Sequence, residues 1–389
     1  MCWDFKKSDI QLSKFSENIM FAFQLKEKDN NTKARCGQIS TVHGTVETPA
    51  FMPVGTQATV KTMTPADLEG MGFQMIIVNA YHLYLRPGHE LVKKLGGLQK
   101  FMGWNKPVAT DSGGFQVLSL AKTRKILENG ISFQSHLDGS SHLLTPQKAV
   151  DIQESLNSDI MMCLDECPPV EAPKEYIEKA VNLTTKWAKE CKASKTDNMK
   201  ALFGIIQGGI FEDLRQKSMD GLMELDFEGY SIGGLGIGEE SEETYKTTEF
   251  CLNTLPENKV RYLMGIGKPA DIVEAVAKGV DLFDCVIPTR NARNGNVFTN
   301  NGKIVIKNAQ YSDDNSPLDE NCGCYTCQNF SRAYLRHIFL AGELLSHRLL
   351  TLHNLYFYAI LMKRIRESIV LGDFNKLKHE ISAKENTKQ

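Results

Sequence analysis

Short apolar segments recur along this chain, and polar loop residues follow each one. Eight of them can be separated, at 50–55, 75–80, 107–112, 160–165, 201–206, 230–235, 261–266 and 281–286. Most precede a stretch with helical periodicity, and this alternation is typical of parallel strands joined by helices. Two helix starts are also marked, because Thr64 and Thr145 each precede a proline, as N-cap residues do.

The same local pattern suits a doubly wound open sheet and a closed barrel, and periodicity does not separate the two. The length of 389 residues and the count of eight segments favour the barrel. We therefore predict an α/β protein, a TIM-like (β/α)8 barrel with a smaller attached module. The segment VFTNNGKIVIKN, 297–308, predicts a hairpin outside the repeating pattern, because Asn-Asn-Gly separates two β-prone runs.

The composition is that of an ordinary globular protein, with 42% hydrophobic and 24% charged residues. The sequence has no apolar run near the roughly 20 residues of a membrane helix, and the first twenty residues do not resemble a signal peptide. We expect a cytoplasmic protein. The net charge is −2, yet residues 285–389 carry 14 Lys and Arg against 9 Asp and Glu, which suits a polyanionic partner.

Three aspartates end predicted strands: Asp111, Asp165 and Asp284. Catalytic groups of a barrel gather at the carboxyl ends of its strands. One such aspartate is commonly only the N-cap of the next helix, but three on one rim suggest an active site. The runs DSGGFQ (111–116), IIQGG (205–209) and SIGGLGIGEE (231–240) add glycines that let the backbone approach a flat ligand. The last run lacks the strand-to-helix context of a dinucleotide site, so we expect no nucleotide cofactor.

The strand DLFDCV has a period of two, which puts Asp284 and Cys285 on opposite faces. If Asp284 faces the barrel mouth, Cys285 faces the helices and is a small buried hydrophobe rather than a reactive thiol. Arg290 and Arg293 follow the acid within ten residues.

A second cluster consists of cysteines in the turn-rich ENCGCYTCQ. Cys322, Cys324 and Cys327 have a spacing that can wrap one tetrahedral zinc ion, while most of the ten cysteines are scattered, as in a reducing compartment. The fourth ligand must come from elsewhere, and His337, His347 and His353 are candidates. Closed coordination outside the carboxylate rim indicates a structural zinc.

These residues together resemble the bacterial tRNA-guanine transglycosylases, in the queuine tRNA-ribosyltransferase family. The resemblance runs from about Phe23 to about His353 and rests on PAFMPVGT, NAYHLYLRPG, DSGGFQV, MCLDEC, GIIQGG, IGGLGIGE, YLMGIGKP, LFDCVIPTRNARNG and CGCYTC followed by His353. It implies a zinc-bearing (β/α)8 barrel that replaces guanine at the tRNA wobble position with a 7-deazaguanine, the prequeuosine base, in queuosine biosynthesis. It also implies a homodimer.

The resemblance implies a role for each matching residue. Asp284 is the nucleophile of a covalent double displacement and Asp111 the acid and base. The base is bound by Ser112, Asp165, Gln207 and Gly234, sandwiched by Phe115 and Met264, and met at its aminomethyl group by Leu235 and Glu239. Desolvation of Asp165 is expected to raise its pKa. Arg290 and Arg293 bind RNA phosphates beside a flipped nucleotide, and zinc is held by Cys322, Cys324, Cys327 and His353.

This sequence departs from the family pattern in two places. Gly236 and Ile237 replace a common Ala-Val, and the branched Ile237 should narrow the pocket, which with Cys167 favours the compact prequeuosine base over queuine. About twenty extra residues lie at the N-terminus, so translation starts at either Met1 or Met20. The predicted division is a tail at 1–20, the barrel with N-terminal strands at 21–308, the zinc-binding module at 309–353, and a C-terminal helix and tail at 354–389.

Two other functions compete with base exchange. A non-catalytic tRNA-binding subunit of the same fold would need only the basic module and the zinc site, and it predicts loss of the catalytic acids, whereas Asp111 and Asp284 are both present. A metal-dependent barrel hydrolase would need histidines at several strand ends, but only His82 and His89 follow one.

Overall fold

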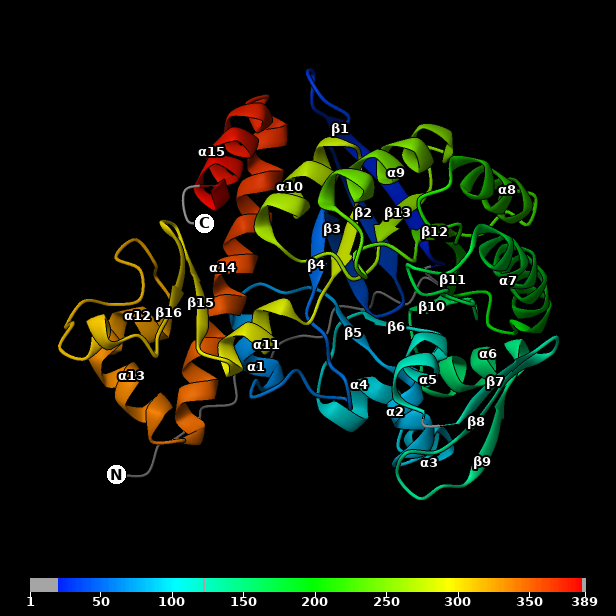
Figure 1. Cartoon of the computed structure of the whole chain (residues 1–389), viewed down its shortest axis with the longest axis horizontal. Helices are drawn as coiled ribbons and strands as arrows, with labels where there is room; N and C mark the ends of the chain where they lie inside the picture. The colour runs from blue at the N-terminus through cyan, green and yellow to red at the C-terminus, as the bar shows by residue number, and fades with distance from the viewer. Residues whose placement is uncertain (1–19, 122, 387–389) are drawn as a thin grey trace, which may run out of the picture.

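The computed structural model describes residues 20–121 and 123–386, so the predicted tail at 1–20 and the choice of start at Met1 lie outside it, apart from Met20. Its centre is a sheet of eight parallel strands in the order β4-β14-β13-β12-β11-β10-β6-β5 (Figure 1). A parallel bridge between Val54 and Ile77 joins the two ends of this sheet, which closes it. The predicted barrel is therefore confirmed and the open sheet is excluded.

Each of the eight barrel strands lies in one of the predicted apolar segments or begins one residue before it. Their bounds are β4 Ala50–Met52, β5 Ile76–Val78, β6 Val108–Thr110, β10 Ile160–Met162, β11 Ala201–Ile206, β12 Gly229–Ile232, β13 Val260–Leu263 and β14 Leu282–Asp284. Most of these residues are buried, as strands covered on both faces must be.

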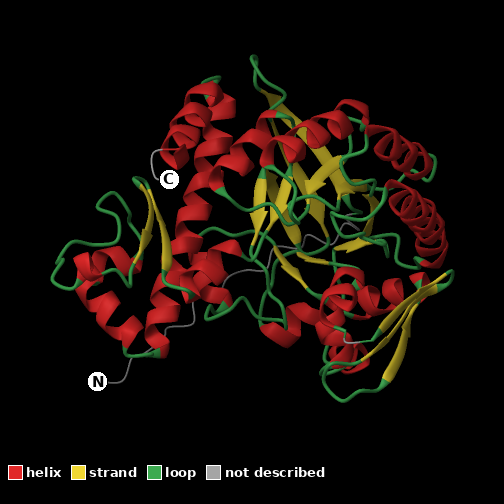
Figure 2. Cartoon of the chain, viewed as in Figure 1, coloured by secondary structure: helices red, strands yellow, loops and turns green. Residues whose placement is uncertain are grey.

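Helices surround the barrel (Figure 2). They are α1 Pro65–Gly70, α2 Ala80–Leu85, α3 His89–Lys94, α4 Gly97–Met102, α5 Gly114–Leu120, α6 Pro146–Ser155, α7 Lys174–Ser194, α8 Glu212–Met223, α9 Ser241–Thr254, α10 Pro269–Ala277 and α11 Ile287–Arg293. Both predicted caps are confirmed. The Thr64 hydroxyl accepts a hydrogen bond from the Asp67 N–H at 3.2 Å, and the Thr145 hydroxyl accepts one from the Lys148 N–H at 3.1 Å.

Side chains alternate between two hydrophobic layers. Phe203 and Leu282 lie in the layer inside the barrel, and Phe283 and Cys285 lie in the layer between strands and helices. The predicted alternation around Asp284 is confirmed. Cys285 is 8% exposed, and burial raises the pKa of its thiol to about 12, so it is an inert buried residue.

An antiparallel sheet covers the amino-terminal end of the barrel. It consists of β1 Ala22–Lys28, β2 Arg35–Thr41 and β3 Gly44–Thr48, in that order. Its Ile39 and Val46 join the layer inside the barrel, and the Phe21 ring meets the edge of Phe203 at 5.9 Å between ring centres. A second antiparallel sheet, β7 Arg124–Leu127, β8 Gly130–Gln134 and β9 Ser141–Leu144, lies outside the barrel and was not predicted.

The predicted hairpin is confirmed as β15 Asn296–Thr299 and β16 Gly302–Val305. It belongs to a lobe with its own hydrophobic cluster, together with η1 Ala309–Tyr311, α12 Tyr325–Asn329 and α13 Arg332–Leu340. The 28-residue helix α14, Leu344–Leu371, begins in this lobe and runs on along the barrel to α15, Phe374–Asn386 (Figure 1). Among the described residues, no helix is long and apolar enough to span a bilayer.

One buried ion pair ties β2 to the barrel. Arg35 donates to both carboxylate oxygens of Asp281, and its Nη atoms also reach the carbonyls of Glu257 and Lys259 at 2.7 and 2.9 Å. Asp281 is fully buried and also accepts from the Arg261 N–H at 2.8 Å. The pair therefore has its hydrogen bonds satisfied without water.

We expect Arg35→Ala to lower the free energy of unfolding by about 3–5 kcal/mol, because it leaves a buried carboxylate without its cation. Urea denaturation measures this change. The control is Lys217→Ala, which removes an ion pair to Glu178 that is about half exposed and should cost less than about 1 kcal/mol. Equal losses in the two variants would show that the buried pair has no special role.

Candidate active site and metal centre

The carboxyl ends of the barrel strands bring the three predicted aspartates to one rim. Asp284 is the last residue of β14, Asp111 follows β6, and Asp165 follows β10 by three residues. Asp111 and Asp165 are 9% and 7% exposed, whereas Asp284 is more open to solvent. The structure thus confirms the convergence that the strand-end pattern indicated.

Asp284 is hydrogen-bonded at one oxygen. The Tyr262 hydroxyl and the Gly265 N–H donate to its Oδ1 at 2.5 and 3.0 Å. Within the described ranges no hydrogen bond reaches its Oδ2. Burial raises the pKa of Asp284, although the bonds from Tyr262 and Gly265 lower it in part.

Asp111 is hydrogen-bonded at both oxygens. The N–H of Ala80, at the start of α2, donates to Oδ1 at 2.9 Å, and the Asn79 amide donates to Oδ2. Burial raises the pKa of Asp111 to about 6, against the effect of these bonds, and the charge of Asp284 raises it further. Asp111 can therefore gain and lose a proton near neutral pH, and the negative charge of Asp284 favours its protonated form.

Four residues predicted to bind a base lie together. Asp165 accepts from the Gln207 amide at 2.7 Å and from the Ser112 hydroxyl at 3.4 Å, and burial raises its pKa to about 6, as predicted. Gly234 has a φ of +65°, and a Cβ there would lie 2.5 Å from the Gln207 Oε1, so the site requires glycine. The arrangement offers hydrogen-bonding groups to the edge of a flat ligand.

The loop after β12 is held by Glu239. Its carboxylate accepts from the N–H groups of Gly236 and Ile237, the latter at 3.1 Å, and from the Thr244 hydroxyl at 2.6 Å. Burial raises the pKa of Glu239, but these bonds outweigh it and the net pKa is lowered, so Glu239 is an anion. The Leu235 side chain is buried in the hydrophobic layer between strands and helices. Only the backbone of Leu235 could therefore contact a ligand.

The remaining predicted residues surround this rim. Phe115, in the first turn of α5, is 49% exposed, and Met264 follows β13 and packs on the inner layer. Arg290 is exposed on α11, while the Nη1 of Arg293 is buried and has no hydrogen-bond partner among the residues described. That Arg290 and Arg293 contact RNA therefore remains a prediction.

Asn79 and Tyr262 also belong to this rim, although neither was predicted as a site residue. Asn79 follows β5 directly and so carried the same strand-end signal as Asp111. Tyr262 lies two residues before Met264 and shares its strand face, which period-two reasoning could have shown. Their bonds to Asp111 and Asp284 make them part of the site.

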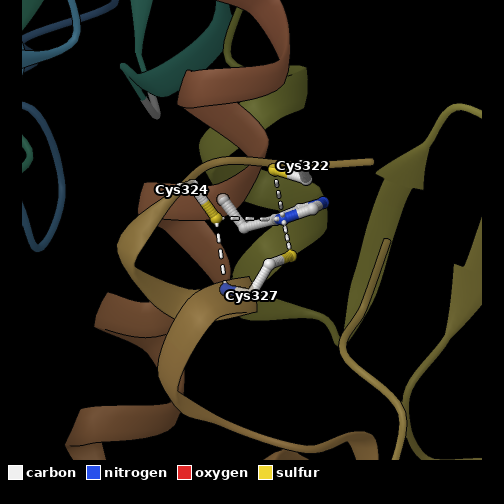
Figure 3. Close-up of side chains that lie close together, drawn as sticks. Cys322, Cys324 and Cys327 are labelled. Carbon is white, nitrogen blue, oxygen red and sulfur yellow. Dashed lines mark hydrogen bonds between the residues drawn. The ribbon is translucent and has the colours of Figure 1, made fainter. Parts of the chain in front are cut away.

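The candidate metal centre lies in the C-terminal lobe, away from the rim. The Nδ1 of His353 lies 3.7, 3.4 and 3.2 Å from the sulfurs of Cys322, Cys324 and Cys327 (Figure 3). A tetrahedral zinc with usual bond lengths would separate nitrogen and sulfur ligands by about 3.6 Å. The Nε2 of His353 lies 2.7 Å from the Phe298 carbonyl, which can orient the ring. The group could hold a metal ion, and of the three candidate histidines it contains His353.

The histidines of the hydrolase alternative do not form such a centre. His89 lies near Glu90 and Asp151, yet the Lys148 ammonium is 2.9 Å from its Nε2. The same ammonium donates to Asp151 at 2.7 Å, so a lysine already occupies the space between these two ligands. His82 instead packs against His136, with ring centres 6.0 Å apart.

Comparisons with known proteins give the same family name throughout. A sequence profile of the family "Queuine tRNA-ribosyltransferase" matches residues 29–387. A queuine tRNA-ribosyltransferase of Thermoanaerobacter sp. (strain X514) is 56% identical over 348 residues, 89% of this chain and 93% of the relative. One from Caldanaerobacter subterraneus subsp. tengcongensis is 54% identical over 93% of this chain and 97% of the relative, and one from Thermodesulfovibrio yellowstonii is 52% identical over 92% and 94%.

The raised pKa of Asp165 predicts a pH-dependent stability. Its folded pKa of about 6 exceeds the ordinary 3.8, so the protonated carboxyl stabilises the fold at low pH and this contribution is lost as the pH rises through about 6. Between about pH 3.5 and pH 7.5, the unfolding free energy of the wild type should fall by up to about 3 kcal/mol relative to Asp165→Asn. Denaturant unfolding of both proteins across this range measures the difference.

Asp138→Asn is the control for this measurement. Asp138 is exposed, and hydrogen bonds from Ser140 and Ser135 lower its pKa to about 2, so the difference should have the opposite sign. A flat difference for Asp165→Asn would mean that Asp165 is not desolvated.

Proposed function

This chain belongs to the queuine tRNA-ribosyltransferase family, and from that premise we propose that it is a tRNA-guanine transglycosylase. It exchanges guanine at the anticodon wobble position of tRNA for the 7-deazaguanine prequeuosine base, in queuosine biosynthesis. The observation that supports this most is the rim itself, where two buried acids with raised pKa values adjoin a more open aspartate. We place the protein in the cytoplasm, because its proposed substrate is tRNA.

Asp284 is the nucleophile in this proposal. Its Oδ1 is held by Tyr262 and Gly265, so Oδ2 is the oxygen that attacks the anomeric carbon of the ribose. The bond from carbon to the guanine nitrogen breaks with its electron pair on guanine, and a covalent ribosyl ester forms. The incoming base attacks the same carbon and releases Asp284, so two inversions give net retention.

Asp111 handles the proton. With a pKa of about 6 it can donate a proton to guanine as it leaves and then take one from the incoming base. Asn79 and the start of α2 hold both of its oxygens, which fixes their direction. The low dielectric of the rim strengthens these interactions.

The base lies between Phe115 and Met264, with its edge toward Ser112, Asp165, Gln207 and Gly234. The aminomethyl group of the prequeuosine base meets the Leu235 backbone and the anionic Glu239, a pairing of opposite charges. The branched side chain of Ile237, 39% exposed, narrows the entrance, and this with Cys167 favours the compact base over queuine.

The tRNA anticodon loop is the macromolecular substrate. The wobble nucleotide must leave the base stack to reach Asp284, and flipping exposes its phosphates. Arg290 and Arg293 lie on α11, directly after the nucleophile, and make no ion pair with the described acidic residues, so they can bind phosphate oxygens.

We also propose that the protein is a homodimer in which one subunit catalyses while the other orients the tRNA. The C-terminal lobe supports this, because it exposes several large apolar side chains that a partner could cover. They are Tyr325, Tyr334, Leu340, Leu344 and Leu345.

The ion at the Cys322, Cys324, Cys327 and His353 group is zinc in this proposal, and its role is structural. Three thiolates and one imidazole are a usual zinc donor set, and all four ligands come from the protein, which leaves no open position for a substrate.

Base exchange is tested with unmodified tRNA and labelled guanine. The wild type should incorporate the label and Asp284→Asn should lose the activity by at least about a thousandfold, because an amide cannot form the ribosyl ester. The control is Asp220→Asn, an exposed aspartate near the end of α8 that accepts a hydrogen bond from the Gln216 amide. A covalent protein–RNA adduct should be trapped from the wild type and not from Asp284→Asn.

Three outcomes are distinguished by this experiment. A wild type that binds tRNA without exchange would be a non-catalytic subunit, and one that hydrolyses a substrate in a metal-dependent way would be a hydrolase. Full activity of Asp284→Asn would overturn the assignment of the nucleophile.

The metal assignment is tested by elemental analysis and unfolding. The wild type should hold about one zinc per chain, and Cys324→Ser should lose it and unfold at a lower temperature. Cys251→Ser, at a buried cysteine of α9 away from the lobe, is the matched control and should keep the metal. Loss of activity in Cys324→Ser with unchanged folding and tRNA affinity would contradict a structural role.

A further inference from the structure

A buried arginine lies behind the base-binding residues. Arg215 is on the inward face of α8 and is 0% exposed. No ion pair joins it to an acidic residue in the described part of the chain. Burying an unpaired cation costs free energy, so the contacts of Arg215 should show what offsets this cost.

The guanidinium is held by three backbone carbonyls. Its Nη1 donates to Ile206 and Gly233, both at 2.8 Å, and its Nε donates to Gly209 at 2.7 Å. Ile206 is the last residue of β11, and Gly233 follows the last residue of β12. Arg215 thus binds the two strands where their ladder ends, next to the bond from the Gly233 N–H to the Ile206 carbonyl at 3.0 Å.

These carbonyls flank the residues that we assign to base recognition. Gln207 lies between Ile206 and Gly209 in the chain, and Gly234 follows Gly233. The same face of α8 supplies Ser218, whose hydroxyl accepts from the Gln207 N–H at 3.1 Å. The backbone of this loop also packs closely on α8, because a Cβ at Gly208 would lie 2.8 Å from the backbone nitrogen of Arg215.

Two polar atoms near this point are buried and have no hydrogen-bond partner among the residues that the structure describes. They are the Oε1 of Gln207 and the Nη2 of Arg215. A Cβ at Gly234 would lie 2.5 Å from the first and 3.9 Å from the second, so both face the same glycine. Unsatisfied buried groups are rare in native proteins, so each requires a physical explanation.

We propose that Arg215 is a positioning residue for base recognition. Its guanidinium sets the spacing and direction of the ends of β11 and β12, so that Gln207 and Gly234 meet the edge of the base. Arg215 does not touch the base. This inference rests on the proposed base exchange and deepens it, because it predicts a residue that governs affinity for the free base and not for tRNA.

Arg35 provides a matched control. It is also a buried arginine that donates to two backbone carbonyls, but it lies at the opposite end of the barrel and its charge is paired with Asp281. Arg215→Lys and Arg35→Lys therefore make the same chemical change at two buried positions. Only the first is next to the base-binding loops.

The test measures labelled guanine exchange into tRNA, at a temperature where thermal melting shows each protein to be folded. Arg215→Lys should raise the KM for guanine by at least about tenfold, because one ammonium cannot hold three carbonyls in a fixed plane. The KM for tRNA should stay within about twofold, and kcat should fall by less than the KM for guanine rises. Arg35→Lys should lower the melting temperature and leave both KM values within about twofold.

Calorimetric binding of guanine, without tRNA, should show the same weakening for Arg215→Lys. An unchanged guanine KM in a folded Arg215→Lys protein would overturn the inference. If Arg215→Lys does not fold, Ser218→Ala is the variant to measure. It removes the acceptor of the Gln207 N–H and should raise the KM for guanine about threefold or more. An unchanged KM for guanine in Ser218→Ala would also overturn the inference. Failure of base exchange itself would differ, because the wild type would then incorporate no guanine.

Discussion

Exclusion of water from the carboxylates at the rim is the constraint on which the chemistry of this site depends. Closing eight short strands into a barrel brings their carboxyl ends together, and burial is the largest influence on the pKa of Asp111, Asp165 and Asp284. The three differ in what replaces the lost water. Asp284 is bonded at one oxygen and Asp111 at both. One rim therefore holds an open carboxylate and a buried acid whose raised pKa lies near neutral pH.

The two buried arginines illustrate how a barrel separates stability from function. At the amino-terminal end, Arg35 is neutralised by Asp281 and joins β2 to the barrel. At the carboxyl end, Arg215 donates to three backbone carbonyls, and burial lowers the pKa of its guanidinium. The carboxylate of Asp281 offsets part of the desolvation cost of the Arg35 cation, whereas at Arg215 hydrogen bonds to neutral carbonyls must do so. That difference follows the division of TIM barrels into a stabilising face and a reactive face.

The sequence predicted what local patterns encode. Buried strands and Thr-Pro helix starts are short-range signals, and the barrel and both caps were predicted correctly. The sheet of β7, β8 and β9 was missed because β7 is largely exposed and has no apolar run. A nonlocal hydrogen bond also helps to hold this sheet: it joins the Tyr81 hydroxyl to the Nδ1 of His136, between β8 and β9, at 2.8 Å. Asn79 and Tyr262 were missed because their partners depend on pairing: β5 lies beside β6 and β13 beside β14. Strand neighbours are a property of the closed sheet and of no single segment.

The group that could hold a metal ion and the carboxylate rim are connected through one turn of α14. His353 belongs to the metal group, and its neighbour Asn354 donates to the carbonyls of Pro288 and Asn296 at 3.0 and 3.1 Å and accepts from the Phe298 N–H at 3.1 Å. Pro288 lies in α11, the helix that follows Asp284 and carries the two arginines expected to bind RNA. A metal ion that fixes His353 also fixes the register of Asn354 against α11. Its influence on catalysis would thus be exerted through the position of a helix, since no ligand of the metal reaches the rim.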